Sequence, residues 1–158
     1  MADLTFVPSP YTFVSLTLCI DASQHVLLAR ESRPDCRGKY YVPAGRGQPG
    51  EDPIAIAHRT TLEKTGIIIE PTGIIGIEHN PPIGQYPGQI RTFLVARAMG
   101  GTLKVHEDEH SLDAVWMPYP VIKELKGLRN EDFLTWLDDA ILGQPCLPAS
   151  SWRALGNR

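Results

Sequence analysis

A chain of 158 residues, 42% hydrophobic and 21% charged, is long enough to form one globular domain whose core needs neither disulfides nor a structural metal. The net charge of −3 excludes a global positive field that would recruit a nucleic-acid polymer or an anionic membrane, and no apolar run approaches the roughly 20 residues that span a bilayer. Because the three cysteines lack metal-type spacing and the N-terminus lacks a signal-peptide pattern, we expect reduced thiols and a cytoplasmic protein.

In chain order, the first structural signal is a set of three strands. Alternating apolar and small residues with β-branched enrichment predict the first two, and a short run before Pro43 predicts the third. The predicted strands cover residues 13–20, 26–29 and 40–42. Turn residues separate the first two strands, and a polar loop precedes the third.

The next signal predicts a helix over residues 53–65. Asp52 is a good N-cap, and Pro53 suits the first helical position because it loses no hydrogen bond there. Gly66 is a natural C-terminal stop.

The sequence pattern in the second half of the chain predicts four more strands and two helices. The strands cover residues 67–69, 73–79, 91–98 and 113–117, with a loop rich in proline and glycine over 80–89. A short helix follows Pro120, and an amphipathic helix over 131–142 has Phe133, Leu134, Leu137 and Ile141 on its inner face. From residue 143 on, we expect an irregular tail. These elements indicate one α+β domain with a mixed sheet between helices.

Residues 45–67 contain a spaced set of glycines and charged residues, namely Gly45, Glu51, Arg59, Glu63, Gly66 and Ile67. The stretch resembles the Nudix box, a glycine loop and helix of enzymes that cut diphosphates linked to another moiety. The resemblance implies a single Nudix domain over residues 1–158, built as an α/β/α sandwich with a ligand cleft beside the box helix. It also implies a structural role for Glu51 and Arg59, which would orient the glycine loop on the helix.

Four further stretches resemble one branch of this family. They are residues 31–46, which include Cys-Arg-Gly and Pro-Ala-Gly, and residues 93–97, 100–104 and 111–116. They are similar to the branch that hydrolyses 8-oxo-guanine nucleoside diphosphates, and the likeness covers roughly residues 12–125. It implies hydrolysis of a nucleoside diphosphate or a similar diphosphate-linked compound.

Two positions of the box depart from the family pattern. Thr60 and Lys64 stand where the family has glutamates that hold Mg2+ on one helix face together with Glu63. Since an ammonium repels a cation that a carboxylate would attract, the change weakens metal binding by roughly several kcal/mol. We therefore expect an altered Mg2+ site with Glu63 as one ligand. Glu107 or Glu109 would supply another, unless residues 106–110 are simply a solvated acidic loop.

The remaining candidates concern the ligand and its chemistry. Lys39, Arg46 and Lys64 are candidates to hold phosphate, and Arg91 is a candidate anion contact. The acid–base candidates are Glu63, Glu78 and His79. Adjacent strand residues point to opposite sides, so Glu78 and His79 cannot both face one site.

Three functions are compatible with this pattern. The first is a hydrolase of a diphosphate-linked small molecule with a weakened metal site. The second is a repurposed Nudix-fold enzyme that isomerises or rearranges a small molecule by metal-independent acid–base chemistry. The third is a non-catalytic ligand-binding module. In each case the expected partner is a small molecule, and a homodimer is left open.

Overall fold

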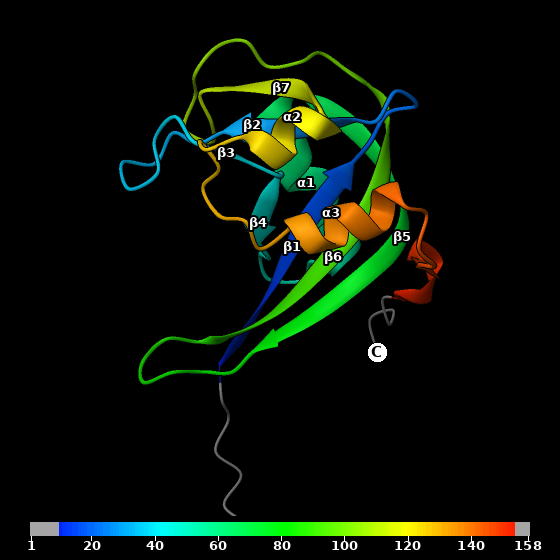
Figure 1. Cartoon of the computed structure of the whole chain (residues 1–158). Coiled ribbons are helices and arrows are strands. Elements are labelled where there is room, and N and C mark those ends of the chain that lie inside the picture. Colours follow the sequence, from blue (N-terminus) through cyan, green and yellow to red (C-terminus); the bar gives the residue numbers. More distant parts are fainter. Residues whose placement is uncertain (1–9, 154–158) are drawn as a thin grey trace, which may run out of the picture.

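Two β-sheets organise residues 10–153, the part of the chain that the computed structural model describes (Figure 1). The larger sheet has the strand order β4-β1-β6-β5-β8 and the smaller one the order β3-β2-β7. The larger sheet contains β1 (Tyr11–Cys19), β4 (Ala44–Arg46), β5 (Ile67–Asn80), β6 (Gly88–Gly101) and β8 (Leu147–Pro148). The smaller sheet contains β2 (His25–Arg30), β3 (Tyr40–Tyr41) and β7 (Asp113–Pro118).

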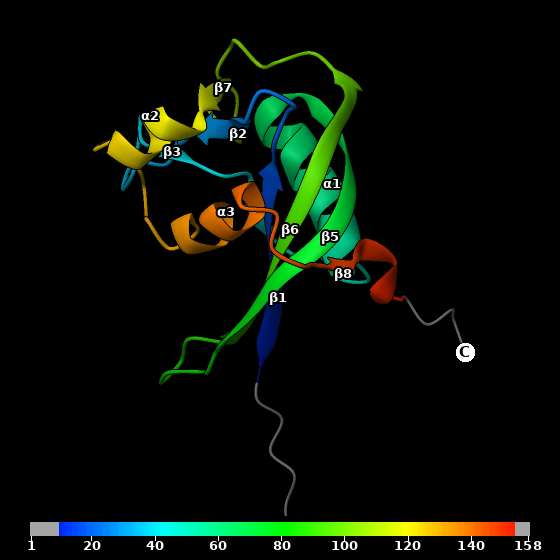
Figure 2. The same ribbon diagram turned by 45° about the vertical axis from the view of Figure 1, so that its right-hand side comes forward.

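Helices cover both faces of the larger sheet (Figure 2). The described elements also include α1 (Pro53–Thr65), α2 (Tyr119–Glu124), α3 (Leu134–Ile141) and the 3-10 turn η1 (Ala149–Ser151). Strand β1 runs parallel to β6 and antiparallel to β4, and β5 runs antiparallel to β6. The predicted mixed sheet between helices is therefore confirmed.

Strand alternation decides which face of the sheet each apolar side chain lies on. Leu16 and Phe93 face the side of α3, whereas their neighbours along the strands, such as Leu94, face the side of α1. The cluster on the α3 side contains Leu16, Leu18, Val26, Leu28, Tyr41, Val42, Phe93, Met117, Ile122, Phe133 and Leu137. The cluster on the α1 side contains Cys19, Leu27, Ala57, Ile67, Ile69, Ile74, Leu94, Ala96 and Ala114.

Helix α1 has the predicted bounds because its ends have strong local signals. Asp52 accepts a hydrogen bond from the backbone N–H of Ala55 at 2.8 Å, and Pro53 begins the helix. Gly66 ends it with φ of 76°, and a Cβ there would lie 2.0 Å from the carbonyl oxygen of Thr102. Both the backbone conformation and the space therefore require glycine at position 66.

The prediction of two short strands over 67–69 and 73–79 was wrong. Residues 67–80 form one continuous strand, and Pro71 is accommodated by a register shift between Pro71 and Gly73. The loop predicted over 80–89 is shorter than expected, because β5 extends to Asn80 and β6 begins at Gly88. Together β5 and β6 form a long hairpin that extends past the other strands of the sheet (Figure 1).

The C-terminal predictions need two corrections. Helix α3 begins at Leu134 rather than Glu131, since the side chain of Asn130 accepts a hydrogen bond from the backbone of Asp132 and forms a turn there. The tail beyond residue 143 is not wholly irregular, because β8 pairs with β5. Phe133 and Leu137 are fully buried as expected. Within residues 10–153, no helix has the length and apolar composition needed to cross a membrane.

Candidate functional site

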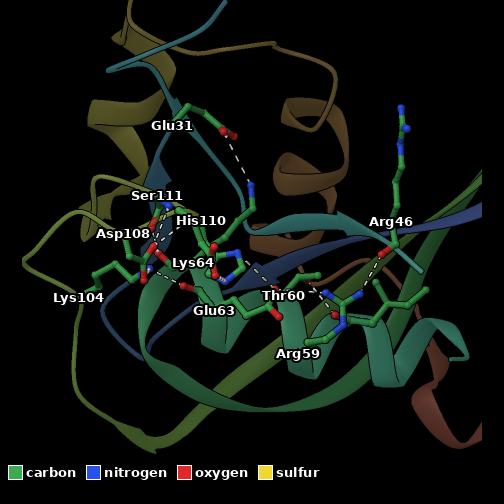
Figure 3. A network of polar contacts seen from close by, with 12 residues as sticks. Glu31, Arg46, Arg59, Thr60, Glu63, Lys64, Lys104, Asp108, His110 and Ser111 are labelled. Atoms are coloured by element: carbon green, nitrogen blue, oxygen red, sulfur yellow. Dashed lines mark hydrogen bonds and ion pairs between the residues drawn. The ribbon is translucent and has the colours of Figure 1, made fainter. Parts of the chain in front are cut away.

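Arg59 attaches the glycine-rich loop to α1. Its guanidinium donates to both carboxylate oxygens of Glu51, at 2.6 and 2.8 Å, and to the carbonyl oxygen of Arg46 at 2.9 Å (Figure 3). The same guanidinium lowers the pKa of Glu51, so the ion pair persists well below neutral pH. In this arrangement the pair positions the loop, which is the role we propose for it.

Thr60 and Glu63 occupy different environments on α1. Thr60 is buried, and its hydroxyl donates to the carbonyl oxygen of Ile56 at 2.8 Å. Glu63 is about one-third exposed and accepts a hydrogen bond from Arg59 at 3.2 Å. Its carboxylate also lies 3.8 Å from Nδ1 of His110 (Figure 3). Glu63 is therefore already engaged by a guanidinium that also holds the loop.

Lys64 points away from Glu63 and toward Glu31, which follows β2 (Figure 3). The distance from Nζ of Lys64 to Oε2 of Glu31 is 3.7 Å, and Arg129 donates to Oε1 of the same carboxylate at 3.1 Å. The Glu31 side chain is 2% exposed and that of Lys64 is 17% exposed. Burial lowers the pKa of Lys64, and the Glu31 carboxylate opposes that shift. One buried carboxylate thus has two cationic neighbours.

A cavity of about 670 Å³ lies where α1, β1, β4 and the segment before α3 meet. This volume is in the range of small-molecule sites. Its lining residues are Val14, Leu16, Arg33, Tyr41, Ala44, Gly45, Arg46, Lys64, Asn80, Gln89, Arg91, Arg129, Asn130 and Asp132. Five of these carry a positive charge and one, Asp132, carries a negative charge.

Asp132 is held firmly in the cavity wall. It accepts a hydrogen bond from the hydroxyl of Tyr41 at 2.6 Å and from Arg91 at 2.5 Å. Arg91 also donates to Glu78 at 2.9 Å, and the indole of Trp136 donates to Glu78 at 3.2 Å. This network connects β3, β5, β6 and the start of α3, so that part of the wall is rigid.

Comparison with known proteins assigns this architecture to a family. A model of the NUDIX domain matches residues 12–137. The chain belongs to the Nudix family. It is 34% identical over 124 residues to the 8-oxo-dGDP phosphatase NUDT18 of Homo sapiens, a match that covers 77% of this chain and 36% of the human protein. It is also 34% identical over 120 residues to the putative nudix hydrolase 1 of Caenorhabditis elegans, covering 73% of this chain and 31% of that protein.

The chain spans about a third of the length of these curated Nudix relatives. Among solved structures, a NUDIX hydrolase from Nitrosomonas europaea superposes with a TM-score of 0.78 at 21% identity and covers 94% of this chain and 99% of that chain. A MutT protein from Methanosarcina mazei Go1 superposes with a TM-score of 0.66 at 21% identity, and the match covers 86% of this chain and 99% of that chain. The predicted Nudix fold and the resemblance to the 8-oxo-guanine branch are confirmed.

Membership of the Nudix family implies Mg2+, but the side chains of the box do not fit it. The hydroxyl of Thr60 donates a hydrogen bond to a backbone carbonyl, and Lys64 is a cation that would repel a metal ion. Glu63 already accepts a hydrogen bond from Arg59. Across residues 10–153, no group of three His, Cys, Asp or Glu side chains is arranged to hold a metal ion. The family's usual cluster of carboxylates is therefore not assembled on α1.

The two glutamates of the acidic loop over 106–110 contact other side chains. Glu107 accepts two hydrogen bonds from Arg37, at 2.8 and 3.1 Å, which lower its pKa. Glu109 is 85% exposed and lies 3.3 Å from Nε2 of its neighbour His110. Within residues 10–153, neither belongs with Glu63 to a group of three or more side chains placed to hold a metal ion.

Glu78 and His79 face opposite sides of the sheet, as strand alternation requires. Glu78 contacts Arg91 in the cavity wall. His79 is exposed, stacks on Tyr11 with ring centroids 5.6 Å apart and is hydrogen-bonded to its hydroxyl. The structure brings only Glu78 of this pair near the cavity.

Of the four proposed phosphate contacts, Arg46, Lys64 and Arg91 line the cavity, whereas Lys39 is exposed and does not. Sequence reasoning missed Glu31, Arg33, Arg129 and Asp132 as members of the site. Glu31 and Arg33 lie in the stretch that resembles the 8-oxo-guanine branch, which was a usable signal. Arg129 and Asp132 precede α3 and reach the cavity only because distant segments pack together. No local sequence pattern predicts such packing.

Proposed function

We propose that this Nudix protein binds a diphosphate-linked small molecule in the cavity, where side-chain cations take over the neutralising role that Mg2+ has in the family. The observation that carries the proposal is the charge of the lining: five cations and one carboxylate line the cavity, and of the cations Arg33 is paired with Asp35 and Arg91 with Asp132 and Glu78. Arginine and lysine are the side chains that bind phosphate oxygens without a metal. Opposite charges 4 Å apart attract by about 4 kcal/mol at an effective dielectric constant of about 20.

The pairing of these cations leaves charge available for a ligand. Lys64 and Arg129 share the single carboxylate of Glu31. In the described part of the chain, no carboxylate lies within ion-pair distance of Arg46, whose exposed side chain extends from β4 at the cavity rim (Figure 3). A diphosphate would supply the counter-charge that these groups lack. We therefore assign the phosphate end of the ligand to Arg46, Lys64 and Arg129.

Hydrolysis of the bound diphosphate is the second candidate function. The similarity to the human 8-oxo-dGDP phosphatase supports it, because 8-oxo-dGDP is a nucleoside diphosphate. The partial exposure of Glu63 beside the box also favours it. The geometry does not favour acid–base chemistry by Glu78 or His79, because Glu78 contacts Arg91 and Trp136, and His79 lies on the other face.

Calorimetric titration with inorganic pyrophosphate and with a nucleoside diphosphate, in the absence of divalent metal, tests the binding proposal. We expect saturable binding that Arg46→Ala weakens about tenfold. The matched control is Arg97→Ala, which removes an exposed arginine paired with Glu70 at 2.6 Å, outside the cavity lining. An absence of binding at millimolar ligand, or an equal loss in both variants, would contradict the proposal.

A phosphate-release assay decides the second candidate. The wild-type chain is compared with the Thr60→Glu and Lys64→Glu double variant, each with and without Mg2+ or Mn2+. Release by the wild-type chain would establish hydrolysis despite the altered box. Release only by the double variant would show that the loss of the two carboxylates had removed hydrolysis, and the calorimetric titration of the wild-type chain shows whether binding was kept.

A further inference from the structure

A second cavity of about 390 Å³ lies at the tip of the β5–β6 hairpin. Its lining residues are Asn80, Pro81, Ile83, Tyr86, Pro87 and Gln89. Asn80 and Gln89 also line the cationic cavity, and they face each other across the β5–β6 pair. The two cavities are therefore adjacent and share one wall.

The hairpin cavity differs from its neighbour in chemistry. Ile83 and Tyr86 are 72% and 70% exposed, and two prolines complete the lining. The backbones of Ile83 and Tyr86 form two mutual hydrogen bonds, of 3.2 and 2.9 Å, which hold both side chains in a defined turn. No charged residue is part of this lining. An apolar group that binds here gains free energy by leaving water.

We propose that the hairpin cavity binds the apolar organic group of the same ligand whose diphosphate occupies the cationic cavity. This inference rests on the proposed function. It specifies the ligand class as a diphosphate ester of a hydrocarbon or aromatic group, because a molecule of that kind has one anionic end and one apolar end. The shared wall of Asn80 and Gln89 lets one molecule occupy both cavities.

The apolar character of the hairpin is what commits the site to this occupant. A sugar or a second phosphate would find no charged partner in this lining and would gain less free energy than an apolar group by covering Ile83, Tyr86 and the prolines. A hydrocarbon or aromatic group loses no hydrogen bonds there, and the ring of Tyr86 offers a surface for stacking. The amides of Asn80 and Gln89 lie at the boundary between the two cavities. The diphosphate of the proposed ligand would join its apolar group at this boundary.

The test compares two probes, inorganic pyrophosphate and a ten-carbon isoprenyl diphosphate, by calorimetry without divalent metal. The wild-type chain should bind the isoprenyl diphosphate at least about tenfold more tightly. The Ile83→Ser and Tyr86→Ser double variant should lose that preference and keep its affinity for pyrophosphate. Ile68→Ser is the matched control, because Ile68 is 50% exposed near the other end of β5. It should leave both affinities unchanged.

The other results separate the failure of this inference from that of the proposed function. Equal wild-type affinities for the two probes would overturn the hairpin site and leave the cationic site intact. A hairpin-dependent affinity for the isoprenyl diphosphate that Arg46→Ala leaves unchanged, with no binding of pyrophosphate, would overturn the proposed function alone. If the double variant keeps the preference but converts a dimer to a monomer in analytical ultracentrifugation, the hairpin is an interface between copies, and the inference is wrong.

Discussion

The ammonium of Lys64 lies 3.7 Å from the carboxylate of Glu31, at the box position where the Nudix pattern has a glutamate. Because Glu31 is almost completely buried, its charge depends on Lys64 and Arg129 for compensation. The substitution of Lys64 is thus structurally coupled to a residue 33 positions earlier in the chain. Restoring the family's glutamate here would place two carboxylates together, with Arg129 as the remaining cation.

Lys64→Glu should destabilise the fold by about 3 kcal/mol, because it replaces a cationic neighbour of a buried carboxylate by a repelling charge. Urea denaturation measures the change in the free energy of unfolding. Adding Glu31→Gln to the same chain should recover a large part of the loss, since the repulsion then disappears. Equal stability of Lys64→Glu and the wild-type chain would show that the two residues are not coupled.

Gly45→Ala should cost about 2 kcal/mol of stability by overpacking. A Cβ at position 45 would lie 2.3 Å from Cγ2 of Thr60 and 3.1 Å from its Cβ. Thr60→Ser removes the nearer atom, so the double variant should be more stable than Gly45→Ala alone. Gly50→Ala serves as a comparison, because it tests backbone strain without a clash: φ there is 85° and no heavy atom lies within 4 Å of the added Cβ. If Thr60→Ser gives no rescue, the contact is not the cause.

Arg59→Lys should lower the free energy of unfolding by roughly 1–2 kcal/mol, because an ammonium cannot reproduce the forked contact with Glu51. It should also weaken pyrophosphate binding, since Arg59 holds the backbone of Arg46 at the cavity rim. Thermal unfolding and calorimetry measure the two effects. Arg97→Lys, at an exposed ion pair, should change stability by less than about 0.5 kcal/mol. An effect of Arg59→Lys no larger than this would contradict the anchoring role.

Pyrophosphate binding should weaken at alkaline pH because burial lowers the pKa of Lys64. Lys64 is charged below that pKa and neutral above it, so its attraction for phosphate is lost as the pH rises through the pKa. The loss should begin at a lower pH than an exposed lysine would allow. Lys64→Arg keeps its charge throughout this range. The ratio of wild-type to variant affinity should therefore fall as the pH rises, and a constant ratio would exclude Lys64 as the phosphate contact.

Local signals in the sequence predict the box well. The bounds of α1 follow from Asp52, Pro53 and Gly66, and the structure has the helix at residues 53–65. The same reasoning fails for Pro71, which predicts a break between two strands. In the structure a register shift against β6 accommodates it, and pairing with β6 maintains the strand on both sides. A single strand has no local signal for such a shift.

The candidate site is less predictable than the helix that supports it. Thr60 and Lys64 mark the departure from the family pattern in the sequence, and strand alternation separates Glu78 from His79. The partners of Lys64 could not be inferred, because Glu31 and Arg129 come from segments that meet it only in the folded chain. Nor could sequence position show that Lys39 lies outside the cavity.

The sequence alone determined the family, the box helix and the loss of two family carboxylates, because these depend on residue type and spacing along the chain. The tertiary structure decided what surrounds the position of one lost carboxylate: Lys64 stands there and, with Arg129, contacts the buried Glu31, next to a cavity whose charged lining residues are mostly cations. The physical reason is that burial and the distances between charges set electrostatic energies, and both arise only when distant segments pack together.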